Sequence, residues 1–82
     1  MTMTRADFGR ALREELNKGY DVVRIARWAY ELHLNATDFE VGLEPEILRV
    51  VAMEEGNEFE LSEEELGRLA DALSANRPFM PH

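Results

Sequence analysis

The segment Leu61-Ser62-Glu63-Glu64-Glu65-Leu66 carries the clearest structural signal in the chain. Its serine is placed to act as a helix N-cap, and the glutamate three residues later completes a capping box. The flanking leucines are placed for a hydrophobic staple. Leucine and alanine residues then recur at helical spacing. The pattern predicts a helix over residues 63–75, followed by a short tail over residues 77–82.

Toward the N-terminus, three further helices are predicted from their start signals. Thr4 and Asp21 are residue types that cap helix N-termini, and Pro45 suits the first turn of a helix. Residues 36–43 are interpreted as a loop, because a single isolated strand is not stable in water. The sequence therefore predicts an all-α bundle of four short helices without a sheet. The predicted helices cover residues 5–18, 22–35, 45–55 and 63–75.

The size and composition of the chain suit one small folded domain, which we expect over residues 1–82. Apolar residues make up 45% and charged residues 32%, a mixture typical of folded rather than disordered chains. The longest nearly uncharged apolar run, residues 47–53, is far shorter than the ~20 residues of a membrane span. Residues 1–13 lack the apolar core of a signal peptide. We therefore expect a soluble, cytoplasmic protein.

The sequence contains no recognisable pattern of catalytic or metal-binding residues. The absence of cysteine excludes a disulfide framework, a thiolate metal site and a thiol nucleophile. His33 and His82 lie far apart and belong to no zinc motif, and Asp38 and Gly42 do not keep the spacing of a calcium loop. We interpret His33 as a core histidine or as one favoured by the end of its helix. The sequence thus predicts no enzymatic activity, no cofactor and no bound metal.

The helix predicted over residues 22–35 is apolar around most of its circumference. Arg24, Arg27 and Glu31 form its one narrow polar stripe. Such a helix must be covered on most sides. Either the other three helices surround it, or part of its surface, with Trp28 and Tyr30, is an interface with a second copy or with another protein.

Acidic residues are concentrated in the second half of the chain. The formal net charge is −8, and residues 36–82 hold twelve acidic side chains against three basic ones. Seven of the twelve residues from 54 to 65 are glutamates. Those at the start of the last helix are favoured by its dipole, but Glu54 and Glu55 lie at the unfavourable end of the preceding helix. The cluster is either a solvated face or a contact surface for an oppositely charged protein.

If the cluster is a contact surface, its partner is predicted to be a cationic protein. The excess of negative charge is unsuited to binding a phosphate backbone. The basic residues of the first half are interleaved with acidic ones rather than gathered into a patch. Neither a nucleic acid nor a membrane is therefore expected as partner. The candidate contact residues, four glutamates and two possible aromatic anchors, are Glu54, Glu55, Glu58, Glu60, Phe59 and Trp28.

Two segments carry a resemblance to known proteins. Residues 19–29 (GYDVVRIARWA) and 53–62 (MEEGNEFELS) are similar to short bacterial proteins, some of which resemble the immunity proteins encoded beside secreted toxins. Such immunity proteins are often small, acidic and helical. The resemblance implies a cationic toxin, commonly a nuclease, as partner, and an inhibitory rather than catalytic role. The alternative is a structural or regulatory domain that self-associates through the apolar helix at residues 22–35.

Overall fold

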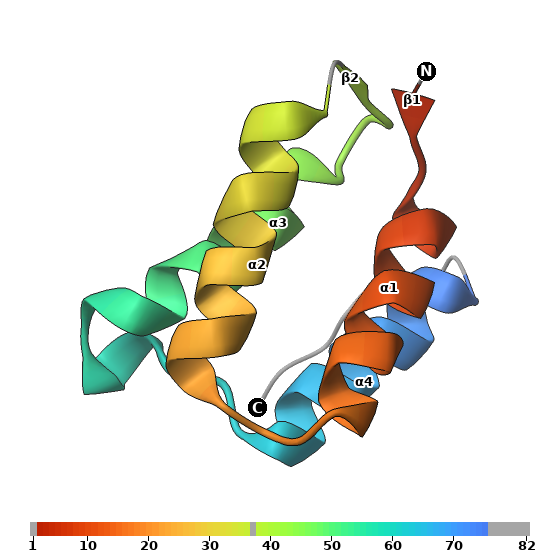
Figure 1. The fold of residues 1–82 in the computed structure, drawn as a ribbon. Helices are drawn as coiled ribbons and strands as arrows, with labels where there is room; N and C mark the ends of the chain where they lie inside the picture. The colour runs from red at the N-terminus through yellow and green to blue at the C-terminus, as the bar shows by residue number, and fades with distance from the viewer. Residues whose placement is uncertain (1, 37, 76–82) are drawn as a thin grey trace.

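A computed structural model describes residues 2–36 and 38–75 and shows four α-helices in them (Figure 1). The prediction of an all-α bundle of four short helices is confirmed. The tail predicted over residues 77–82 lies outside the described residues. The α-helices are α1 (Arg5–Asn17), α2 (Val22–Asn35), α3 (Glu44–Val51) and α4 (Glu63–Ser74). The shorter elements are the 3₁₀ helices η1 (Ala52–Glu55) and η2 (Asn57–Phe59) and the strands β1 (Thr2–Met3) and β2 (Asp38–Phe39).

The starts of three helices follow from side chains that lie within three residues of each N-cap. At α4, the Ser62 hydroxyl accepts a hydrogen bond from the Glu65 amide at 3.1 Å, and the Glu65 carboxylate accepts one from the Ser62 amide at 2.9 Å. Thr4 forms the same reciprocal box at the start of α1. The Asp21 carboxylate accepts from the third amide of α2 at 3.0 Å. The expected N-caps of these helices are thus confirmed, because each satisfies an otherwise unpaired backbone N–H group.

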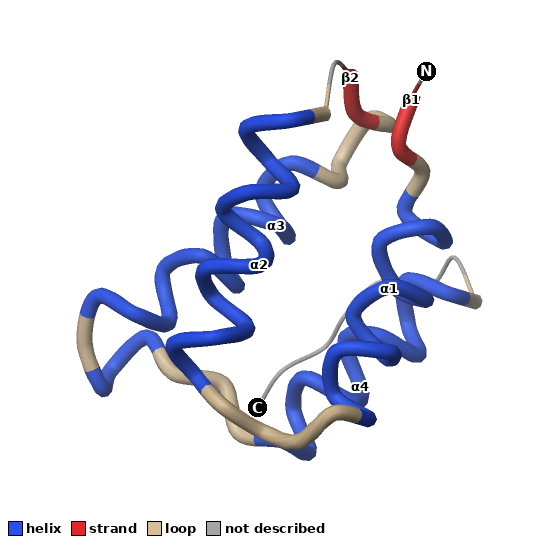
Figure 2. Tube along the Cα trace, in the orientation of Figure 1, coloured by secondary structure: helices blue, strands red, loops and turns tan. Residues whose placement is uncertain are grey.

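The helices pack as two pairs, α1 along α4 and α2 along α3 and η1 (Figure 2). The first pair approaches closely at Gly9 of α1, where an added Cβ would lie 2.7 Å from the Ser74 amide nitrogen and 2.8 Å from the Ala70 carbonyl oxygen. One shared core joins both pairs. Its largest fully buried side chains are Phe8, Leu12, Ile25, Leu43, Ile47, Val50, Met53, Leu66, Leu69 and Leu73.

The position of α2 tests the interpretation that the other three helices surround it. Its inward face buries Ile25, Ala26 and Ala29. On its outer side, however, Tyr30 is 51% exposed and Leu34 is 62% exposed. The interpretation of α2 as a central helix covered by the other three is therefore wrong. Helix α2 is a side helix that leaves apolar surface uncovered.

The helix predicted over residues 45–55 is instead divided between α3 and the 3₁₀ helix η1. Ile47, Val50 and Met53 are all buried, at a spacing of three residues. A 3₁₀ helix has three residues per turn and keeps such residues on one side, whereas a continuing α-helix would turn Glu54 toward the core. The change in helix type therefore buries Met53 and leaves Glu54 exposed.

The segment that the sequence analysis interprets as a loop, residues 36–43, contains a short strand. Strand β2 pairs in parallel with β1, with Thr2 opposite Asp38 and Met3 opposite Phe39. The amide of Glu40 extends the pairing by donating to the Met3 carbonyl at 2.8 Å. The prediction of a fold without any sheet is therefore wrong in this detail. Two residues from the N-terminal segment supply the partner that a single strand lacks.

Candidate functional site

The glutamates predicted to bind a partner lie on a turn between α3 and α4, which we call the acidic turn (residues 54–60). The turn consists of the end of η1, Gly56, η2 and Glu60. Two backbone hydrogen bonds hold it: the Phe59 amide donates to the Gly56 carbonyl at 3.0 Å, and the Glu60 amide donates to the Asn57 carbonyl at 3.2 Å. This short path leaves all of its glutamate side chains exposed, and Phe59 between them is 50% exposed.

Most of the negative charge on the acidic turn is not neutralised within the described protein. Glu54 accepts from the Nε of Arg27 on α2 at 3.3 Å. Glu55, Glu58 and Glu60 form no ion pair with any described residue. A surface pair such as Arg27–Glu54 contributes only about 0–1 kcal/mol to stability. The turn therefore presents three carboxylates without an ion pair to any described residue, together with a half-exposed aromatic ring.

Tyr20 lies close enough to the acidic turn and to the start of α4 to be affected by their negative charges. Its hydroxyl donates to the Leu61 carbonyl at 2.7 Å. The pKa of Tyr20 is raised above its ordinary value, first by burial and then by the negative charges of Glu60, Glu65 and Glu63. Negative charge disfavours formation of a second anion nearby. Glu60 of the acidic turn and two glutamates at the start of α4 therefore act on the same tyrosine hydroxyl.

Trp28 does not lie on the surface formed by the acidic turn. Its ring stacks on that of Phe8 in α1, with centroids 5.4 Å apart and an interplanar angle of 12°. It is partly buried and packs against the hydrophobic core. Trp28 thus connects α2 to α1, while Phe59 is the aromatic residue that the structure places among the candidate glutamates.

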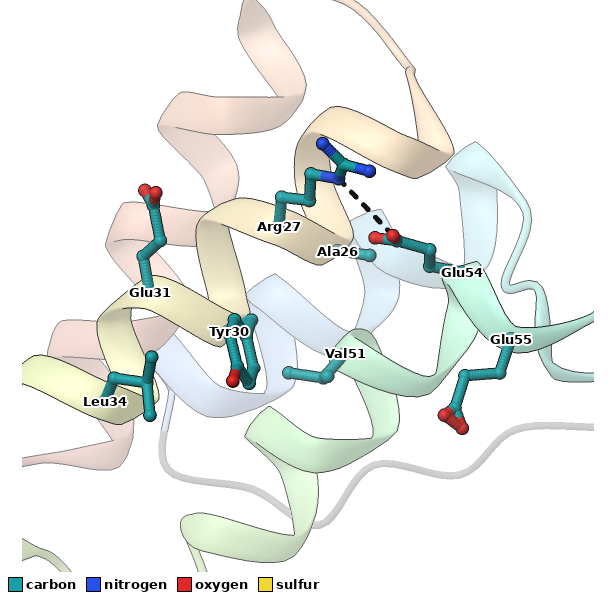
Figure 3. Close-up of a pocket in the computed structure, with 8 residues that line it drawn as sticks. All are labelled: Ala26, Arg27, Tyr30, Glu31, Leu34, Val51, Glu54 and Glu55. Carbon is teal, nitrogen blue, oxygen red and sulfur yellow. Dashed lines mark hydrogen bonds and ion pairs between the residues drawn. The ribbon is translucent and has the colours of Figure 1, made fainter.

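A groove of about 640 Å³ adjoins the acidic turn and shares Glu54 and Glu55 with it; we call it the α2–α3 groove (Figure 3). Tyr30, Leu34 and Val51 supply large apolar side chains to its lining. The sequence predicts Tyr30 as interface surface but does not place Leu34 or Val51 beside it. The repeat of apolar residues four apart along α2 was the available signal. The lining residues are Ala26, Arg27, Tyr30, Glu31, Leu34, Val51, Glu54 and Glu55.

His33 connects the end of α2 with the start of α3. Its Nε2 atom lies 2.9 Å from a carboxylate oxygen of Glu44, and its ring stacks on Phe39 with centroids 5.3 Å apart. The residue is only partly buried, so it occupies the boundary of the core rather than its centre. Among residues 2–36 and 38–75, no group of three or more histidine or carboxylate side chains is arranged to hold a metal ion.

Neither protein-family models, nor curated proteins, nor solved structures match the chain. The resemblance to immunity proteins therefore stays a prediction. In the described part of the chain, every helix is too short or too polar to cross a bilayer.

Proposed function

We propose that this protein acts by binding a cationic protein through the acidic turn, without catalysis of its own. The observation that supports the proposal is the exposure of Glu55, Glu58 and Glu60 on the same turn as Phe59, without ion-pair partners among the described residues. Like charges held close together repel one another and reduce the stability of the folded state. A positively charged surface brought against them removes that repulsion and is attracted from a distance.

Phe59 gives the proposed contact an apolar centre. Binding energy in protein interfaces is concentrated in a few residues, often aromatic, that become fully desolvated. Half of the Phe59 surface is available for such burial. The surrounding carboxylates then form the polar rim that steers the partner and sets its orientation.

The most specific form of the proposal is an immunity-like inhibitor of a bacterial toxin. Enzymes that act on nucleic acids bind their substrates through positively charged surfaces. A folded domain with a net charge of −8 and an exposed acidic turn is complementary to such a surface. Occupation of that surface would block the substrate and would require no reaction chemistry from the inhibitor.

A second candidate function is self-association through α2. The exposed Tyr30 and Leu34 side chains favour it, because exposed apolar patches often mark interfaces. The negative charge on each copy opposes it. Sedimentation equilibrium distinguishes the two functions, since a monomer at physiological salt excludes the self-associating domain.

The proposed function is tested by affinity capture from the source cells with a matched pair of charge reversals. Glu58→Lys alters the acidic turn, and Glu14→Lys makes the same charge change on the exposed face of α1. We expect Glu58→Lys to reduce recovery of a cationic partner about tenfold or more, and Glu14→Lys to leave it nearly unchanged. Equal losses would show that only the net charge matters, and two unchanged recoveries would place the contact elsewhere.

Chemical cross-linking gives this experiment a direct readout of the contact. A carbodiimide joins carboxylates to lysines that they touch, so peptides from residues 54–60 should be recovered attached to lysines of the partner. Cross-links confined to α1 or to the start of α2 would contradict the proposal even if a cationic protein were captured.

A further inference from the structure

We propose that the α2–α3 groove receives one amphipathic, lysine- or arginine-rich helix of the partner protein. This inference rests on the proposed function, because it takes the partner to be cationic, but it concerns a neighbouring surface. In this inference the groove contacts the apolar face of that helix. The acidic turn contacts other, positively charged residues of the partner.

The floor of the groove is apolar surface that the fold leaves uncovered. Tyr30 and Leu34 lie four residues apart on α2 and are each more than half exposed. Val51 of α3 lies across from them, and Figure 3 shows its side chain directed toward the Tyr30 ring. Apolar side chains on two neighbouring helices form the kind of furrow into which a third helix packs.

The rim of the groove carries a net negative charge. Its lining includes the carboxylates of Glu31, Glu54 and Glu55, and its one cation, Arg27, is already paired with Glu54. Figure 3 shows Glu54 and Glu55 at the end of the groove away from Leu34. Glu31 lies at the Leu34 end, so an occupant meets an apolar floor with carboxylates at both ends, which selects an apolar stripe flanked by basic residues.

The walls of the groove favour a helix over an extended peptide. Both walls are helical, so their backbone N–H and C=O groups are used within the walls themselves. An extended peptide would find no strand edge there, and its own backbone groups would lose hydrogen bonds on burial. The backbone N–H and C=O groups of a helix are already hydrogen-bonded within it, so only its side chains need to contact the groove.

The charge of the groove also opposes a second copy of this chain as the occupant. In a two-fold symmetric dimer the same surface meets itself. Glu31, Glu54 and Glu55 of one copy would then approach their counterparts on the other. Charge complementarity therefore points to a basic helix rather than to self-association.

The inference is tested with a synthetic helical peptide of about 18 residues, roughly five turns. Its leucines lie on one helical face and its other positions are lysine and alanine. The first control peptide has the same composition with the leucines scattered, and the second replaces lysine by glutamate. We expect the basic amphipathic peptide to bind about tenfold more tightly than either control, by fluorescence anisotropy. In ¹⁵N NMR spectra, the amides that shift should be those of residues 26–34 and 51–55.

Variants of the protein separate the groove from the acidic turn. Leu34→Ser and Glu31→Gln change exposed groove residues that lie outside the acidic turn, and each should weaken peptide binding about fivefold, while circular dichroism confirms that the fold is kept. Glu58→Gln removes a charge outside the groove lining and should leave peptide affinity nearly unchanged.

Three outcomes of the peptide and NMR experiments overturn the inference. No binding of the amphipathic peptide, or equal binding of the scattered one, means that the groove does not receive a helix. Binding that is sensitive to Glu58→Gln but not to Leu34→Ser overturns the groove while leaving the proposed function of the acidic turn intact. Concentration-dependent shifts of the groove amides without peptide assign the groove to a second copy. A different outcome separates the two proposals in the other direction. If Glu58→Lys and Glu14→Lys both lose partner capture while peptide binding is normal, the proposed function of the acidic turn is refuted and the groove inference stands.

Discussion

Single residues set how closely α1 and α4 approach, and Gly9 is the clearest case. Replacing glycine by alanine inside a helix normally stabilises it by about 1 kcal/mol. At Gly9, however, the added methyl group would lie within 3 Å of backbone atoms of Ser74 and Ala70. Backbone atoms cannot rotate away as a flexible side chain can, so the two helices would have to separate.

We predict that Gly9→Ala lowers the free energy of unfolding by about 1–3 kcal/mol, the usual cost of overpacking a core. Gly67→Ala in α4 is the matched control, because the nearest atoms to its added Cβ are the Arg13 guanidinium nitrogens at 3.6 Å. That variant should be neutral or more stable by up to about 1 kcal/mol. Urea denaturation measures both, and a Gly9→Ala protein as stable as the wild type would show that α1 and α4 can separate freely.

The sequence could predict the elements that depend on neighbouring residues, but not those that depend on contacts between distant parts of the chain. The starts of α1, α2 and α4 depend on Thr4, Asp21 and Ser62, whose partners lie within three residues. The pairing of β1 with β2 joins residues separated by 36 positions, and no local pattern marks it. The change from α3 to η1 depends on the burial of Met53 against other elements. Rules based on neighbouring residues predict neither the strand pairing nor the change of helix type.

The candidate site also combines features that the sequence predicts with features that result only from the packing of the helices. Four glutamates and Phe59 are consecutive or nearly so, and their shared location on one turn could be predicted from the sequence. The orientation of Trp28 toward Phe8, and the placement of Val51 opposite Tyr30, result from how separate helices pack. The α2–α3 groove therefore appears only in the folded structure.

The start of α1 gives a prediction for the pH dependence of one element. The Asp7 carboxylate accepts from the Thr4 amide at 3.3 Å, and the pKa of Asp7 is lowered by the Thr4 side chain first and its backbone next, with a smaller contribution from Arg10. Folding thus favours the ionised form. Its contribution to stability is present above the ordinary pKa of about 3.8 and is lost as pH falls through the lower, folded-state value.

We expect Asp7→Asn to reduce the loss of stability between about pH 5 and pH 2, because the variant has no proton to take up at this position. Glu14→Gln is the matched control, since the Glu14 side chain is exposed on the same helix without a hydrogen bond to another described residue. Urea denaturation across this pH range measures both. A slope as steep in Asp7→Asn as in the wild type would mean that the capping box does not contribute to acid sensitivity.

The charge of the whole molecule connects its stability with its proposed binding. Seventeen acidic side chains against nine basic ones leave the surface strongly negative, and the excess lies almost entirely after residue 35. Self-repulsion of this kind lowers the stability of the free protein. It also provides the long-range attraction for a cationic partner. One set of charges therefore has opposite effects on folding and on association.

The double reversal Glu55→Lys/Glu58→Lys should separate these effects. It replaces two carboxylates that have no ion-pair partner among the described residues, so we expect the free protein to be unchanged or slightly more stable. The wild type should gain stability between about 0.01 M and 0.5 M sodium chloride, over which the screening length falls from ~30 Å to below ~8 Å. The variant should gain less, because less repulsion remains to be screened. Denaturation at each salt concentration tests this directly, and an equal gain in both proteins would mean that repulsion in the acidic turn does not limit the stability of the fold.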